Sequence, residues 1–99
     1  MTEPEFLTTL ENVISERIAA ADTRSYTARL AAAGTVAVAQ KLGEEGVETA
    51  LAAVTESPER LVAEAADLLY HLLVLLKLRG LTLADVVAEL ERRHVPAAE

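Results

Sequence analysis

The sequence predicts an all-α fold of four to five helices that form a helical bundle. Three observations support this: apolar residues recur at helical spacing, capping residues and glycines mark short joints, and no stretch alternates as a strand does. The chain of 99 residues is 52% hydrophobic but only 3% aromatic. Because this length suits one domain, we expect a single domain over residues 1–99, with its core at about residues 4–94.

The first two helices are bounded by proline, serine and glycine. Pro4 suits a first helical position, and the helical spacing of apolar residues continues up to a joint at residues 22–25. Ser25 can cap a short second helix over residues 26–33, which Gly34 then ends.

The third helix is expected at residues 35–54, with Thr35 as its cap. Gly43 and Gly46 lie inside it, where each glycine costs about 1 kcal/mol relative to alanine. The two glycines therefore predict either an irregular helix or close packing at this point.

The last two helices have clear starting signals. Ser57 precedes a proline and can cap a fourth helix over residues 58–79. Thr82 and Asp85 have the spacing of a capping box, with Asp in place of the usual Glu, and they open a final helix that ends before Pro96.

The fourth helix is apolar around most of its circumference. At about 100° per residue its polar residues Glu64, Asp67 and His71 share one narrow arc, and leucines fill most other directions. Such a helix needs burial, yet a domain of about 100 residues buries only about 60–70% of its unfolded surface. We therefore expect a homodimer that completes the bundle across a two-fold axis. The alternative is a monomer with an exposed leucine patch, which soluble proteins seldom tolerate.

The formal net charge of −7 comes from sixteen acidic and nine basic residues. A nucleic-acid clamp or a polybasic membrane anchor needs excess Lys and Arg, so we expect neither a nucleic-acid nor a membrane partner. The absence of cysteine excludes a disulfide scaffold, a thiolate zinc site and a cysteine nucleophile. It also suits a reducing compartment, and the acidic start of the chain is unlike a signal peptide, so we expect a cytoplasmic protein.

Acidic residues gather on the third and fourth helices. Glu45 and Glu48 are neighbours at i,i+3, as are Glu64 and Asp67, and a short joint makes the two helices antiparallel neighbours. Two carboxylates roughly 5–6 Å apart repel by about 3 kcal/mol at an effective dielectric near 20, and burial among leucines adds a desolvation cost. The pattern predicts a divalent cation with oxygen ligands, Mg²⁺ above all and Mn²⁺ as the alternative.

One other interpretation concerns the third helix, and Lys41 and His71 lie close to the acids in the sequence. The acids of the third helix can be a solvated helix face, but this does not explain acidic residues on the apolar fourth helix. Lys41, four residues before Glu45, offsets part of the negative charge. His71 is expected to be a hydrogen-bonded residue that packs in the fold or supports a metal ligand, rather than a metal ligand itself.

The sequence resembles the all-α nucleotide pyrophosphohydrolases, the MazG-type superfamily, through Glu45-x-x-Glu48, fifteen intervening residues and Glu64-x-x-Asp67. Within this superfamily it is most similar to the phosphoribosyl-ATP pyrophosphohydrolases of histidine biosynthesis, over nearly the whole chain. The more specific motifs are Ser25-Tyr-Thr, Lys41-x-Gly-Glu-Glu and Asp67-Leu-Leu-Tyr-His. Two departures are Gly46, where the family commonly has alanine, and residues 36–40, which lack the basic residues often found there.

The resemblance implies hydrolysis of 1-(5-phosphoribosyl)-ATP to 1-(5-phosphoribosyl)-AMP and pyrophosphate, the second step of histidine biosynthesis. The implied metal ligands are Glu45, Glu48, Glu64 and Asp67, and the implied catalytic residues are Glu44 and Glu45. Glu44 would orient water or bind a further ion. The candidates for contact with the substrate are Lys41, Arg24, Arg29 and Tyr26. The ring of Tyr26 is expected either to pack in the fold or to stack on the base.

Partners and rival functions follow from the same resemblance. The next enzyme of the pathway, a cyclohydrolase, is sometimes fused to this family and uses zinc-binding cysteines. Because this chain has none, we expect a stand-alone hydrolase and a separate cyclohydrolase. One rival is a MazG-type enzyme acting on ordinary nucleoside or deoxynucleoside triphosphates. The rival of another class is a non-catalytic helical dimerisation module.

Overall fold

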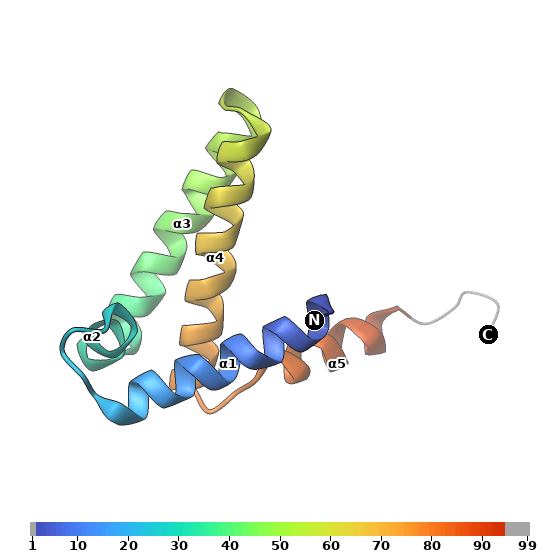
Figure 1. Cartoon of the computed structure of the whole chain (residues 1–99). Helices are drawn as coiled ribbons and strands as arrows, with labels where there is room; N and C mark the ends of the chain where they lie inside the picture. The colour runs from blue at the N-terminus through green and yellow to red at the C-terminus, as the bar shows by residue number, and fades with distance from the viewer. Residues whose placement is uncertain (1, 95–99) are drawn as a thin grey trace.

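The computed structural model describes residues 2–94, and these residues form five helices and no strand (Figure 1). The helices in chain order are α1 (Glu3–Ala20), α2 (Tyr26–Ala33), α3 (Thr35–Thr55), α4 (Pro58–Leu78) and α5 (Leu83–Arg93). The predicted all-α class is confirmed. Within the described part of the chain, no helix has both the length and the apolar character that a membrane crossing needs.

The long helices α3 and α4 form an antiparallel hairpin, and the other helices gather at one end of it (Figure 1). α1 crosses this end, which we call the base of the hairpin, and α2 lies beside the start of α3. The buried core also lies at the base, where α1, α3 and α4 meet; its buried members are Ile14, Val38, Leu73 and Val74. The far part of the hairpin therefore consists of α3 and α4 alone.

Side-chain caps fix four of the five helix starts among residues 2–94. Ser25 and Ser57 accept hydrogen bonds from backbone N–H groups three residues later, and Thr82 forms a capping box with Asp85, as the sequence predicts. A second capping box, between Thr2 and Glu5, opens α1 one residue earlier than expected. Local side-chain chemistry thus defines most of the helix boundaries.

The prediction that Thr35 caps α3 is wrong. Thr35 is the first residue of α3, and Gly34 is the N-cap, without a side-chain hydrogen bond. Gly34 has a φ of 98°, a backbone conformation that residues with side chains rarely adopt. The chain therefore turns from α2 into α3 at a residue that has no side chain with which to cap the helix.

The third helix is continuous through both of its glycines, so the expected irregularity is absent from it. A Cβ atom built at Gly46 would lie 3.9 Å from Leu68 Cδ1 of α4, an ordinary contact, and one at Gly43 would meet nothing within 4 Å. Gly46 faces α4 and leaves room for a methyl group. The alanine that the resemblance leads us to expect at this position would therefore fit there.

Candidate metal centre

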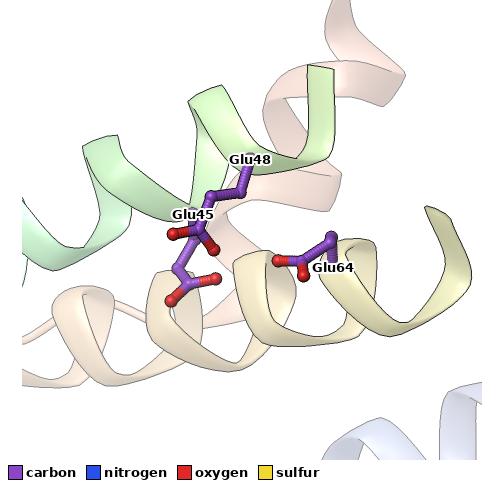
Figure 2. Close-up of side chains that lie close together, drawn as sticks. All are labelled: Glu45, Glu48 and Glu64. Atoms are coloured by element: carbon purple, nitrogen blue, oxygen red, sulfur yellow. The ribbon is translucent and has the colours of Figure 1, made fainter. Parts of the chain in front are cut away.

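Three carboxylates meet between α3 and α4, and we call them the acid cluster (Figure 2). Glu45 and Glu48 come from successive turns of α3, and Glu64 faces them from α4. One carboxylate oxygen of each residue lies within 4.8 Å of the other two. Glu45 and Glu64 are buried, with 4% and 6% of their surface exposed, whereas Glu48 is exposed. The predicted meeting of the two acidic arcs is thus present for these three residues.

Each buried acid has one paired and one unpaired oxygen. Lys41 Nζ lies 2.9 Å from Glu45 Oε1, and Arg60 Nη2 donates a hydrogen bond to Glu64 Oε1. The Oε2 atoms of both glutamates are buried and lack a hydrogen-bond partner among residues 2–94. Leaving a buried acceptor unsatisfied costs about 1–3 kcal/mol, and more for a charged group. The fold therefore keeps two buried, unsatisfied carboxylate oxygens, each with this free-energy cost, in the acid cluster.

The pKa values of the two glutamates of α3 move in opposite directions. The hydrogen bond from Lys41 holds the pKa of the Glu45 carboxyl below its ordinary value, although burial works against this. The pKa of Glu48 is raised, first because a protonated Glu48 can donate a hydrogen bond to Glu64, and then because the charge of Glu45 repels a second charge. Glu48 thus differs from Glu45 and Glu64, because no basic side chain in the described structure forms an ion pair with it.

The donor set of the acid cluster fits a hard divalent cation. All three residues offer carboxylate oxygens, which Mg²⁺ and Mn²⁺ prefer over nitrogen or sulfur ligands. The two unpartnered Oε2 atoms supply free lone pairs, and the exposure of Glu48 gives the site contact with solvent. Mg²⁺ usually keeps several water or phosphate ligands besides its carboxylates, which an open site of this kind permits.

The other two predicted acids lie beside the cluster but outside it. Asp67 is exposed on α4, three residues after Glu64, and Glu44 is exposed next to Glu45 on α3. Neither belongs to the group whose oxygens lie within 4.8 Å of one another. Their roles as a metal ligand and a catalytic residue stay predictions.

The four predicted substrate residues have different surroundings. Lys41 lies at the cluster through its ion pair with Glu45. Arg24 is exposed and pairs with Asp22 at 2.7 Å, and Arg29 Nη1 donates a hydrogen bond to the backbone oxygen of Thr23 at 2.8 Å. Both arginines thus hold the loop between α1 and α2.

Tyr26, the fourth candidate, has a hydrogen-bonded hydroxyl and is partly exposed to solvent. Its hydroxyl lies 2.7 Å from His71 Nε2, and His71 Nδ1 lies 2.6 Å from the backbone oxygen of Asp67. Because that oxygen can only accept, Nδ1 donates to it, and in the neutral imidazole Nε2 then accepts a hydrogen bond from the Tyr26 hydroxyl. Tyr26 as a whole remains 45% exposed. As expected, His71 is a buried, hydrogen-bonded residue.

Two features of the site were missed in the sequence. One is the attachment of α2 to α4, where the Tyr26–His71 bond is joined by a bond between Thr27 and the Tyr70 hydroxyl. The other is Arg60, which stands four residues before Glu64 just as Lys41 stands four residues before Glu45. This repeated spacing was a signal from which the second ion pair could have been predicted.

Comparison with known proteins adds an independent observation. The sequence profile of a family described as phosphoribosyl-ATP pyrophosphohydrolase matches residues 7–94. A protein named phosphoribosyl-ATP pyrophosphatase from Pyrobaculum calidifontis is 63% identical over 84 residues, which cover 85% of this chain and 89% of that protein. The protein of the same name from Pyrobaculum islandicum is 58% identical over 89 residues, covering 90% of this chain and 95% of its own length.

Longer proteins match as well. The histidine biosynthesis bifunctional protein HisIE of Escherichia coli strain K12 is 54% identical over 89 residues. The match covers 90% of this chain but 44% of that protein. A segment of this chain that includes the acid cluster is thus similar to part of a larger bifunctional protein.

The raised pKa of Glu48 predicts a pH-dependent effect on stability. Folding raises this pKa, so the folded chain gains stability from the bound proton at acidic pH and loses it as the pH rises through the raised value. Glu48→Gln is therefore expected to raise the melting temperature of metal-free protein at neutral pH. It should have little effect below the ordinary pKa of 4.5, where Glu48 is neutral as well.

Melting followed by circular dichroism in a chelator, across this pH range, measures the difference. Glu44→Gln is the matched control, because Glu44 is an exposed neighbour outside the cluster, and it should leave the melting temperature unchanged. A Glu48→Gln protein that melts lower than wild type at neutral pH would show that the three carboxylates do not repel.

Proposed function

The chain belongs to the phosphoribosyl-ATP pyrophosphohydrolase family, and we propose that it hydrolyses 1-(5-phosphoribosyl)-ATP with the help of Mg²⁺ held by the acid cluster. The products are 1-(5-phosphoribosyl)-AMP and pyrophosphate, and the chain is a hydrolase of histidine biosynthesis. The observation that most supports the metal is the pair of buried, unpartnered Oε2 atoms of Glu45 and Glu64. Mn²⁺ is the alternative ion.

The proposed metal ligands are Glu45, Glu48 and Glu64, with Asp67 as a further ligand from the next turn of α4. When bound, the ion supplies positive charge to the polyphosphate and lowers the pKa of a coordinated water. Burial keeps Glu45 and Glu64 in fixed positions, while Glu48 and Asp67 lie open to solvent, from which the substrate arrives.

The reaction needs a water to attack the α-phosphorus. A bond forms between the water oxygen and this phosphorus, and the bond from phosphorus to the pyrophosphate oxygen breaks. Glu44, exposed beside Glu45, is the proposed acceptor of the proton that the water loses.

The proposed substrate contacts surround the start of α2 and the middle of α3. Lys41, already at the cluster, can donate to a phosphate oxygen, and Arg24 and Arg29 are the further candidates for phosphate. Tyr26 has its hydroxyl engaged by His71, so the part that it offers to a substrate is its half-exposed ring. A ring in this state suits stacking on an adenine base.

We also propose that the chain works as a homodimer and that a separate cyclohydrolase acts on its product. The hairpin has apolar residues on its outer surface: Val47, Leu51 and Val54 follow one face of α3, and Val62 and Leu69 one face of α4. The radius of gyration is 15.4 Å, against about 13 Å for a compact domain of 100 residues. A second copy would cover this apolar surface. The cytoplasmic location expected from the sequence stays a prediction.

The substrate assignment is tested by pyrophosphate release from purified protein with Mg²⁺. Release from phosphoribosyl-ATP, with little or none from dCTP or dUTP, is the expected result. The opposite preference would favour the rival enzyme that acts on ordinary nucleotides. Failure of the gene to rescue a histidine auxotroph lacking this step would count against the proposal independently.

The assignment of Asp67 is tested by Asp67→Asn, which keeps the size of the side chain and removes its charge. We expect kcat to fall by at least about 100-fold, as for other groups that stabilise charge in a transition state. The fold should persist in the metal-free protein because Asp67 is exposed. Glu59→Gln, an exposed acid in the first turn of the same helix, is the control and should keep full activity. Wild-type turnover of Asp67→Asn would remove this residue from the site.

The dimer is tested by sedimentation equilibrium. Two copies of the 10.6 kDa chain give a mass of about 21 kDa. Replacing Val47 and Leu51 together by glutamate places two charges on the exposed face of α3, and this variant should sediment with a smaller mass at the same concentration. A single species at 10.6 kDa for the wild-type chain would rule the dimer out.

A further inference from the structure

Arg60 occupies a position that helix stability alone does not favour. It is the third residue of α4, after the Ser57 cap and Pro58, where the positive end of the helix dipole disfavours a cation. It also precedes Glu64 by four residues, which is the weaker order for an ion pair on a helix. The reason for an arginine at this place must therefore lie in the groups that it contacts.

The Arg60 side chain contacts two acids in different environments. Its Nη2 donates a hydrogen bond to Oε1 of the buried Glu64, and its Nε lies 3.9 Å from Oε1 of Glu56. Glu56 is exposed and is the C-cap residue of α3, in the joint between the two long helices. One guanidinium group therefore connects the acid cluster with an acid at the surface.

Binding of a metal ion would change the balance of charge between the acid cluster and its two basic partners. The acid cluster carries three negative charges, against the two positive charges of Lys41 and Arg60. A divalent cation bound by the same carboxylates adds two more positive charges, so the sum of these charges changes from −1 to +1. One of the two basic side chains must then weaken its contact, because like charges at such short range repel.

Arg60 is better able than Lys41 to give up its contact with the acid cluster. It is 55% exposed, whereas Lys41 is 37% exposed, and it already has Glu56 as a second partner. If its guanidinium moves fully to Glu56, Oε1 of Glu64 becomes free beside the Oε2 atom that is already unpartnered. Both oxygens of Glu64 can then face the ion.

We propose that Arg60 is a built-in competitor of the divalent cation: it neutralises Glu64 in the metal-free protein and transfers to Glu56 when the metal binds. This inference rests on the proposed function, since it presupposes that the acid cluster binds a divalent cation. Arg60 thereby lowers the metal affinity of this chain and stabilises its metal-free state. Glu56 has the opposite effect on affinity, because it gives the displaced guanidinium a partner.

The test is the affinity of the full chain for Mn²⁺ without substrate, measured by isothermal titration calorimetry. Arg60→Gln is expected to bind Mn²⁺ about fivefold more tightly than wild type, a size in keeping with the strength of partly exposed ion pairs. Arg17→Gln, which removes an exposed arginine from α1, is the matched control for net charge and should change the affinity little. In a chelator, Arg60→Gln should melt below wild type, and saturating Mn²⁺ should reduce this difference.

A second variant separates competition from a general charge effect. Glu56→Gln removes the alternative partner of Arg60 and is expected to weaken Mn²⁺ binding by about twofold. The same change in an Arg60→Gln background should have no effect, because no guanidinium is left to transfer. Equal or weaker Mn²⁺ binding by Arg60→Gln would overturn the competition while leaving the acid cluster as a metal site. No Mn²⁺ binding by any of these proteins would overturn both the site and the competitor.

Discussion

The mutual repulsion of three carboxylates is the interaction on which the rest of this structure depends. Glu45, Glu48 and Glu64 place oxygens within 4.8 Å of one another between α3 and α4 (Figure 2). The hairpin resists this repulsion through the short joint at one end and the buried core at its base. The members of the buried core, Ile14, Val38, Leu73 and Val74, are different residues from the acid cluster, and Glu48 of the cluster is open to solvent. A site for a charged, soluble substrate needs this combination of rigidity and access.

Two kinds of contact hold the acids in place. Along each helix, a basic residue four positions earlier takes one oxygen of the buried glutamate, Lys41 on α3 and Arg60 on α4. Across the helices, α2 is attached to α4 by the bond from Tyr26 to His71 and by the neighbouring bond between Thr27 and Tyr70. Because His71 lies seven residues, or about two turns, after Glu64, the attachment of α2 also fixes the rotation of α4 that points Glu64 at α3.

The sequence predicted what depends on local spacing and missed what depends on tertiary packing. The helices, most of their caps and the approach of the two acidic arcs follow from periodicities that the chain itself contains. The same arc of α4 nevertheless has a buried Glu64 and an exposed Asp67, since the burial of each depends on how α4 sits against α3. The cap of α3 was wrongly predicted because the backbone turn at Gly34 decides it. The Tyr26–His71 bond joins residues 45 positions apart, beyond the reach of any local pattern.

The most direct measurement of the central claim is an anomalous difference map from crystals of the full chain grown with Mn²⁺. If the acid cluster holds a metal ion, the map should show a peak between α3 and α4 with Glu45, Glu48 and Glu64 as its nearest protein ligands. The Arg60 side chain should then be turned towards Glu56. The ion should remain when phosphoribosyl-AMP is added. Ordered carboxylates at the cluster with no peak between them, or Mn²⁺ bound only at other surfaces, would contradict the claim that these acids are held together for a metal.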